Sequence, residues 1–383
     1  MSFDDGFQDS MNFAFSDEQQ MLRDQAQRFL MERSPLTAAR AVLESDADYD
    51  KAVWQGMAEL GWMGTAIPET YGGIGLGHLE LCVLAEEMGR ALAPTPFASS
   101  VYLATEALLQ SGNETIKRAL LPDLANGSRI GTLALAEGVG VPAPGRINTS
   151  VSNGKLSGSK LPVPDGMAAG LAVVVAKAEP GRDAVGLYVV DLAGSGVSRA
   201  PVTSIDPSRP MARIDFDGAE ATALGDPAAG WDDLSRLLDR AAVLIAFEQV
   251  GGAQAALEMA RDYALERYAF GRPIGSFQAI KHKLADMYVA TELARSNAYY
   301  GAWALSTDAP ELPVAAATAR ISATDAYHLS SKENIQTHGG MGFTWEFDCH
   351  LYYRRSKHLA LALGSQRRWK DTLITRLEER NAA

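Results

Sequence analysis

The chain has 383 residues, of which 47% are hydrophobic and 21% are charged. This composition is typical of a soluble globular protein and excludes intrinsic disorder, and the length predicts two or three domains. The formal net charge of −12 argues against nucleic-acid binding, which needs a basic surface, so any anionic ligand must be met by local cations.

The N-terminal residues 1–13 are acidic and lack the basic and apolar regions of a signal peptide, so we expect no secretory leader. No apolar run approaches the roughly 20 residues that span a bilayer, so we expect no membrane partner. The two cysteines, Cys82 and Cys349, are far apart in the sequence, which is typical of a reducing compartment. We therefore expect a cytoplasmic protein.

Residues 1–128 are expected to form a helical domain. Ser16 and Gln19 make a capping-box start, and apolar residues follow at helical spacing up to Leu30. Asn113 opens a further helix, which the pair Asn126-Gly127 ends.

Residues 129–228 change character and predict a β-domain. Short segments rich in strand-forming residues are separated there by Gly, Pro, Asn and Asp. These segments are residues 129–138, 155–163, 170–178, 185–193 and 211–224. Their mixed alternation favours a small antiparallel barrel or sandwich over a parallel sheet.

Residues 229–383 return to a helical pattern with short links. Helices are expected at 231–266, 276–306, 311–338 and 345–361, with a tail from Arg367. Long helices with short links indicate a four-helix bundle. The predicted fold is therefore mainly α, with a central small β-domain between a helical domain and a bundle.

The turn between the first two bundle helices, within residues 266–286, carries the most specific chemistry. Pro273 and the glycines beside it break the helix, with Arg267 and Phe270 before the break and Gln278 after it. A guanidinium, an aromatic face and an amide at a helix start suit a nucleotide pyrophosphate and its adenine. The alternative is an ordinary helical hairpin with surface charges.

A second glycine block, QTHGGMGF at 336–343, follows the third bundle helix. Glycines there let backbone N–H groups approach an anion closely. The alternative is a helix C-cap with a Schellman turn.

The basic cluster Arg354, Arg355 and Lys357 favours a solvated face or an ion pair between subunits over a phosphate site. The scattered histidines and the missing metal motifs predict no metal site.

Together these blocks resemble the acyl-CoA dehydrogenase family. The resemblance extends over nearly the whole chain, in family order, through residues 15–30, 59–90, 266–286 and 333–360. It implies the same helical, β and bundle architecture, usually as a tetramer built on the C-terminal bundles. It also implies FAD as cofactor, an acyl-CoA substrate and an electron-transfer flavoprotein as partner.

The resemblance assigns the adenine end of the FAD site to residues that are present here. In the family, the matching residues hold the pyrophosphate and adenine of a flavin bound mainly to a neighbouring subunit. They are Arg267, Phe270, Gln278, Gln336, Gly339 and Gly340. Ser365 matches a threonine that contacts FAD, although a helix N-cap is an equal alternative for it.

The ring end of the site departs from the family pattern. Of the motif T-E-P-x-x-G-S-D, only Glu137 is matched within residues 136–142. The family's W-I-T strand is replaced by Pro162-Val163-Pro164, and two prolines remove two backbone donors. Ring binding by this chain is therefore in doubt, although the backbone of 133–137 could still reach the flavin.

The family's two positions for the catalytic base are both vacant. Leu363 occupies the place of the glutamate in the family's Y-E-G-T motif, and Ala241 occupies the alternative place on the first bundle helix. Glu248 lies two helical turns after Ala241 on the same face, among apolar residues, and is the predicted base. The alternative for Glu248 is an acid paired with an arginine or facing a subunit contact.

Two functions follow from the resemblance. The first is an FAD-dependent acyl-CoA dehydrogenase that forms a 2,3-enoyl-CoA, with Glu248 as base. The second is a half-site subunit of a mixed tetramer, as in bacterial members linked to sterol side-chain breakdown. In such a tetramer one chain supplies the base and ring contacts, and the other supplies the adenine end.

Overall fold

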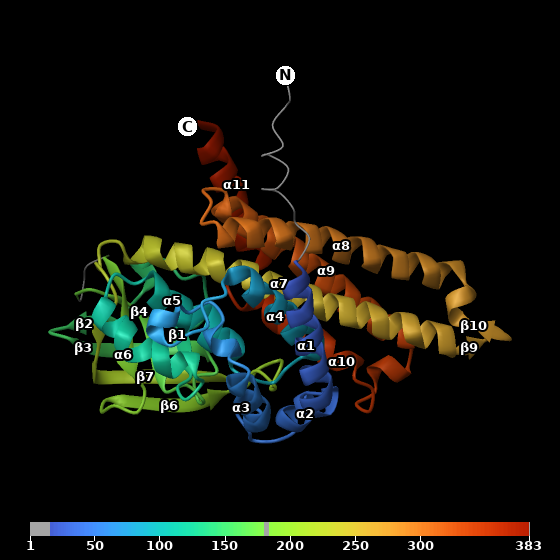
Figure 1. Ribbon diagram of the computed structural model, residues 1–383, viewed down its shortest axis with the longest axis horizontal. Helices are drawn as coiled ribbons and strands as arrows, with labels where there is room; N and C mark the ends of the chain where they lie inside the picture. Colours follow the sequence, from blue (N-terminus) through green and yellow to red (C-terminus); the bar gives the residue numbers. More distant parts are fainter. Residues whose placement is uncertain (1–15, 180–183, 383) are drawn as a thin grey trace.

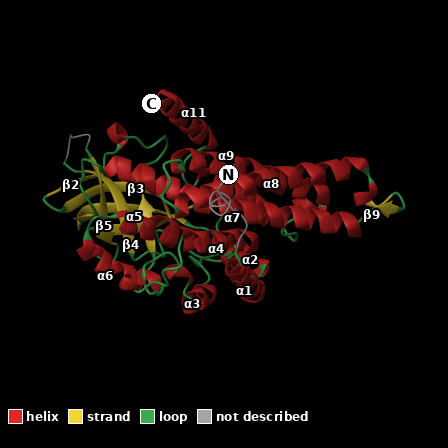
Figure 2. Cartoon of the chain, turned by 45° about the horizontal axis from the view of Figure 1, so that its top comes forward, coloured by secondary structure: helices red, strands yellow, loops and turns green. Residues whose placement is uncertain are grey.

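A computed structural model describes residues 16–179 and 184–382, so the acidic N-terminal stretch 1–13 lies outside the described residues. Figure 1 shows the strands of the central region gathered at one end of the molecule and a long helical bundle reaching away from them, with two short strands at its far tip. The N-terminal helices pack along the side of both. Figure 2 shows the same separation of strands and helices from a second direction.

The N-terminal region is helical, as predicted. The Ser16–Gln19 capping box is confirmed, and the Asn113 side chain accepts a hydrogen bond from the Ile116 N–H as the expected N-cap. The helices are α1 (Asp17–Arg33), α2 (Leu36–Leu43), α3 (Lys51–Glu59), α4 (His78–Ala91), the π-helix η5 (Ala98–Thr105), α5 (Glu106–Gln110) and α6 (Glu114–Ala125), with 3-10 turns η3 (Trp62–Gly64) and η4 (Glu69–Tyr71).

The central region forms one mixed sheet with the order β6-β7-β3-β2-β4-β5-β8, and β1 pairs with β4. Most pairings are antiparallel, as predicted, but β1 and β2 both pair with β4 in parallel. Among the described residues the sheet ends at β6 and β8 and is not a closed barrel. The strands are β1 (Gly131–Ala134), β2 (Ser150–Ser152), β3 (Lys155–Pro164), β4 (Leu171–Lys177), β5 (Val185–Asp191), β6 (Val197–Val202), β7 (Met211–Glu220) and β8 (Thr222–Ala223), with a 3-10 turn η6 (Pro144–Arg146) after β1.

The C-terminal region is the predicted helical bundle. Its helices are α7 (Gly230–Glu266), α8 (Gln278–Ser306), α9 (Leu312–His338), α10 (Cys349–Leu361) and α11 (Gln366–Ala382). Short elements join them, namely β9 (Tyr268–Ala269), β10 (Arg272–Pro273), η7 (Ile274–Ser276) and η8 (Met341–Phe343). The prediction that α10 begins at residue 345 is wrong, because Trp345 lies in a loop that is bonded to the end of α2.

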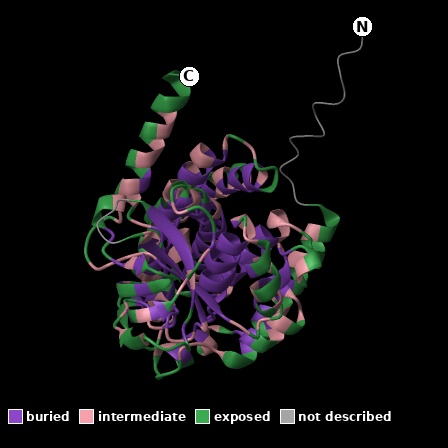
Figure 3. Cartoon of the chain, turned by 90° about the vertical axis from the view of Figure 1, so that its left-hand side faces the viewer, coloured by how far each residue is buried: buried purple, intermediate pink, exposed green. Residues whose placement is uncertain are grey.

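A continuous apolar core runs from the sheet into the bundle, and α7 passes through it. The stretch Ala241–Ala246 of α7 is buried on all sides, so this helix packs against both the N-terminal helices and the bundle. Figure 3 shows this buried interior and the largely exposed α11, where Trp369 is the buried residue. The division into domains at 128/129 and 228/229 stays a prediction.

A buried ionic cluster joins α4, α5 and α7. The carboxylate of Glu106 accepts one hydrogen bond from Arg240 at 2.8 Å and contacts the His78 ring nitrogen at 2.7 Å. Burial alone would raise the pKa of Glu106, but its contacts with His78 and Arg240 lower it to about 2.

Because of this cluster, we expect the protein to lose stability as the pH falls. Because the folded pKa of Glu106 lies below its unfolded value, its contribution to stability is present above about pH 4.5 and is lost as the pH falls toward 2. We expect the difference in urea midpoint between wild type and Glu106→Gln to be largest near pH 6 and to shrink as the pH falls to 3. A constant difference over this range would contradict the assignment.

Candidate functional site

The turn between α7 and α8 presents its predicted site residues outward. α7 ends at Glu266 with Arg267 as its C-cap, and the two-residue strands β9 and β10 make a hairpin whose tip has positive φ at Phe270 (51°) and Gly271 (77°). The Phe270 side chain is 95% exposed. Within the described residues, the Arg267 guanidinium has no hydrogen bond or ion pair, and Gln278 begins α8 with an exposed side chain. Such exposure leaves all three side chains available to a ligand.

The second predicted set lies at the end of α9. Gln336 is exposed, and Gly339 ends the helix with φ 61° and ψ −136°, a conformation that L side chains rarely adopt. Gly340 is different, because its φ of −59° and ψ of −33° are ordinary helical values. A Cβ at Gly340 would meet no atom within 4 Å. Nothing described in this chain therefore requires glycine at position 340.

The two sets lie at the same end of the bundle (Figure 1). Tyr263, one turn before Arg267, stacks on His338 with ring centroids 4.0 Å apart. Behind this contact, Lys283 of α8 pairs with Glu333 of α9 at 2.6 Å. These contacts hold the ends of α7, α8 and α9 together, so the two predicted sets, all of whose residues are exposed, lie at one end of the bundle.

Ser365 does not belong to this surface. It precedes α11, far from the β9–β10 hairpin (Figure 1), and its Oγ accepts the Arg368 N–H at 3.3 Å. This is the N-cap bond that we gave as the alternative for Ser365. The serine also lines an open groove of about 810 Å³ between α11, the start of α7 and Val141. Its contact to a flavin stays a prediction.

The segment that matches the family's ring-binding motif is bonded within the sheet region. The Leu161 N–H donates to the Ala136 carbonyl at 2.8 Å, and the Gly138 N–H donates to the Leu161 carbonyl at 2.7 Å. Glu137 accepts from the buried Lys160 at 2.8 Å and from the Thr149 N–H at 3.0 Å. Burial would raise the pKa of Glu137, but Lys160 and these donors lower it to about 2. Glu137 therefore anchors its own loop.

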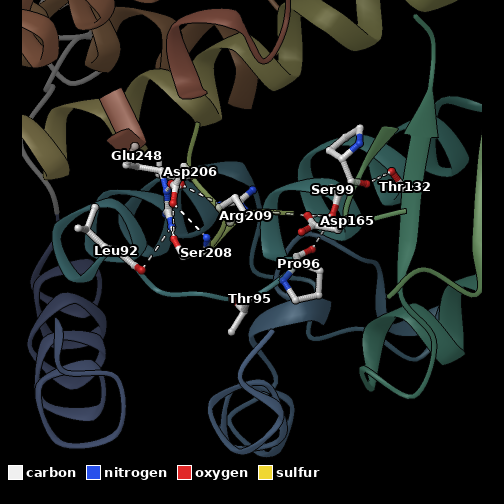
Figure 4. A network of polar contacts seen from close by, with 12 residues as sticks. Leu92, Thr95, Pro96, Ser99, Thr132, Asp165, Asp206, Ser208, Arg209 and Glu248 are labelled. Atoms are coloured by element: carbon white, nitrogen blue, oxygen red, sulfur yellow. Dashed lines mark hydrogen bonds and ion pairs between the residues drawn. The ribbon is translucent and has the colours of Figure 1, made fainter. Parts of the chain in front are cut away.

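Glu248 lies in a buried ionic network at the junction of the sheet region and the bundle (Figure 4). Its Oε1 accepts a hydrogen bond from Arg209 Nη1 at 3.2 Å and lies 3.7 Å from Arg355 Nη1. Arg355 also donates to Asp206 at 2.5 Å, and Arg209 lies 4.0 Å from Asp165. Pairing with an arginine is the alternative that we gave for Glu248, but the identity of its partners was not predicted, because they come from a loop and a helix that are distant in the sequence.

The side chains of this network are almost fully buried. Burial raises the pKa of Asp165; burial also opposes ionisation of Asp206, but the Arg355 guanidinium outweighs it and lowers the pKa of Asp206. Arg320, also buried, has a pKa lowered to about 9 by burial although Glu248 opposes the shift. A carboxylate held between guanidiniums is typical of a structural ion pair. The role of Glu248 as a base stays a prediction.

Within residues 16–179 and 184–382, no group of three or more His, Cys, Asp or Glu side chains is placed to hold a metal ion. The same residues include no helix with the length and apolarity needed to cross a bilayer.

Comparisons with known proteins agree with the resemblance. Two family models match, "Acyl-CoA dehydrogenase, N-terminal domain" over residues 16–128 and "Acyl-CoA dehydrogenase, C-terminal domain" over residues 228–377. Acyl-CoA dehydrogenase IpdE2 of Mycobacterium tuberculosis is 34% identical over 352 residues, which cover 92% of this chain and 94% of that protein.

Solved structures extend the likeness to three dimensions. A variant of the Tcur3481-Tcur3483 steroid ACAD has a TM-score of 0.87 and 31% identity, covering 96% of this chain and 99% of that one. Butyryl-CoA dehydrogenase from Megasphaera elsdenii has a TM-score of 0.88 and 25% identity, covering 96% of this chain and all of that one (100%).

Proposed function

Because this chain belongs to the acyl-CoA dehydrogenase family, we propose that it takes part in the α,β-dehydrogenation of an acyl-CoA thioester as one subunit of a two-chain enzyme. In this proposal the chain supplies the adenine end of an FAD site that its partner completes. The similarity to IpdE2 and to a steroid ACAD named for two chains supports a ring-containing acyl group and a partner subunit of the same family.

The observation that carries the proposal is the contrast between the two halves of the site. At the bundle end, the adenine-end residues are exposed and Gly340 leaves space that no described residue of the chain fills. At the ring end, Pro162 and Pro164 replace side chains and donors that a flavin ring would need, and the acid of the motif is bonded to Lys160. The residues present therefore fit one end of FAD better than the other.

In the proposed complex, bound FAD would supply the acceptor for the hydride that leaves the thioester's β-carbon as a base removes the α-proton. Arg267 would meet the pyrophosphate charge, and Phe270 and Gln278 would meet the adenine. The backbone of Gly339 and Gly340 would approach the same nucleotide closely, which a side chain at position 340 would prevent. The base and the ring contacts would come from the partner chain, with the electrons passing to an electron-transfer flavoprotein.

The first test is the visible spectrum. We expect the chain purified alone to be colourless and the chain co-expressed with its partner subunit to carry flavin that an acyl-CoA bleaches. Stoichiometric flavin in the chain alone, bleached by acyl-CoA, would instead support the self-sufficient enzyme with Glu248 as base.

The second test is Gly340→Ala. Alanine fits the helical φ and ψ of this position, so the folded chain should be as stable as wild type or slightly more stable, by about 0.4–1 kcal/mol. The flavin content of the complex should nevertheless fall, because the methyl group occupies the space left for the nucleotide. Gly112→Ala is the matched control, since a Cβ there also meets nothing within 4 Å. Unchanged flavin content in Gly340→Ala would count against the adenine site.

A further inference from the structure

The loop that carries Gly339 and Gly340 is held at three points, one of which involves a tryptophan with an unusual set of partners. At its start, His338 stacks on Tyr263. In its middle, Gly342 lies so close to α9 that a Cβ there would be 2.5 Å from the Ile335 carbonyl oxygen. At its far side, Trp345 is bonded to the N-terminal helices. The first two contacts involve the bundle, whereas the third joins the loop to a different region of the chain.

Trp345 is surrounded by cations and an imidazole although 47% of the residue is exposed. The Arg40 and Arg354 guanidinium carbons lie 5.7 Å and 5.5 Å from the indole centroid. The His350 ring stacks on the indole at 4.7 Å with an interplanar angle of 18°. A tryptophan face attracts cations more strongly than other aromatic faces do, so these contacts favour one position of the indole.

The edge of the same indole is fixed by a directional bond. Trp345 Nε1 donates to Glu44 Oε1 at 2.6 Å. Arg40 Nη1 pairs with that carboxylate oxygen at 3.3 Å, and Arg40 Nη2 pairs with Asp348 at 2.6 Å. Because Arg40 and Glu44 belong to α2 and its C-cap, the end of the glycine loop is connected to the N-terminal region.

We propose that Trp345 is a positioning residue that holds the Gly339–Gly340 loop in place through Arg40, Glu44, Arg354 and His350. Trp345 acts by keeping the loop end fixed, so that the backbone at 339 and 340 keeps one spacing from the end of α7. The inference rests on the proposed function only where it states what this loop is held for, namely the nucleotide.

Hydrogen–deuterium exchange tests the holding role without any cofactor. In Trp345→Ala, amides of residues 340–344 should exchange about tenfold faster than in wild type, because several ring contacts and one bond are lost together. Exchange in the buried part of α7 should not change. Phe343→Ala is the matched control, because it removes an 87% exposed ring from the same loop and should leave exchange unaltered.

Trp345→Phe distinguishes a loss of local contacts around the ring from general misfolding. Phenylalanine keeps a ring among the cations but loses the bond to Glu44, so its effect on exchange should be intermediate. Exchange in Trp345→Ala that equals wild type would overturn the positioning role, as would an equal rise throughout α7 and α9.

An ADP titration of the co-expressed complex depleted of flavin then tests what the loop is held for. We expect ADP affinity to fall about tenfold in Trp345→Ala and less in Trp345→Phe. Faster exchange without any ADP binding by the wild-type complex would support the positioning role and contradict the proposed function. The exchange measurement can therefore contradict the positioning role, and the ADP titration can contradict the proposed function.

Discussion

Replacing Glu248 with alanine is expected to lower the free energy of unfolding by about 3–5 kcal/mol, the usual cost of removing one partner from a buried ion pair. The side chain is fully enclosed, and its loss would leave the Arg209 and Arg355 guanidiniums facing each other without the intervening carboxylate. Urea unfolding followed by circular dichroism measures this change.

Glu258→Ala is the control on the same helix. Glu258 pairs with Arg90 at the edge of the bundle, where its side chain is 25% exposed, so we expect a loss below about 1 kcal/mol. A Glu248→Ala variant that is no less stable than Glu258→Ala would contradict the structural assignment of Glu248.

Glu248→Gln decides between the structural and catalytic roles. Glutamine keeps an acceptor for Arg209 and removes the capacity to take a proton. If Glu248 is structural, acyl-CoA dehydrogenation by the two-chain complex should stay within about tenfold of wild type, with reduced stability. A folded Glu248→Gln complex that has lost dehydrogenation would restore the carboxylate as the base.

The limits of sequence reasoning are visible at this same network. The helical spacing places Glu248 correctly on one face of α7 among apolar residues, but spacing within a helix cannot reveal what packs against that face. Arg209 comes from the loop before β7 and Arg355 from α10. Arg355 was expected on a solvated or inter-subunit face and is instead buried, because its charge is matched by Asp206 within the same chain.

Predictions from the sequence were reliable for contacts between residues that are close together in the sequence. The capping residues Ser16 and Asn113 identify helix starts because their bonds span three residues. The strands β2 and β6 were missed for the opposite reason. β2 has only three residues, and β6 is an exposed edge strand with Pro201, so neither has an apolar pattern and both depend on pairing with distant strands.

Gly251→Ala is expected to be among the most destabilising additions of a single methyl group to this chain. α4 and α7 cross so closely that a Cβ at Gly251 would lie 1.8 Å from the Glu86 carbonyl oxygen. The contact is reciprocal, because a Cβ at Gly89 would lie 1.8 Å from the Glu248 carbonyl oxygen. Both obstacles are backbone atoms of buried helices, so relief requires the two helices to separate.

Separation of α4 from α7 would disturb the ion pairs of Glu86 with Arg23 and Arg295 as well as the packing of the Glu248 network. We therefore expect Gly251→Ala to lower the free energy of unfolding by about 4 kcal/mol or more, beyond the usual range of overpacking. Gly301→Ala in α8 is the matched control. A Cβ there meets the Val243 side chain at 3.1 Å, and the gain in helix propensity of about 1 kcal/mol offsets the crowding. Equal urea midpoints for the two variants would contradict this expectation. They would show that α4 and α7 can separate without loss of stability, and that the junction around Glu248 is less rigid than its backbone contacts indicate.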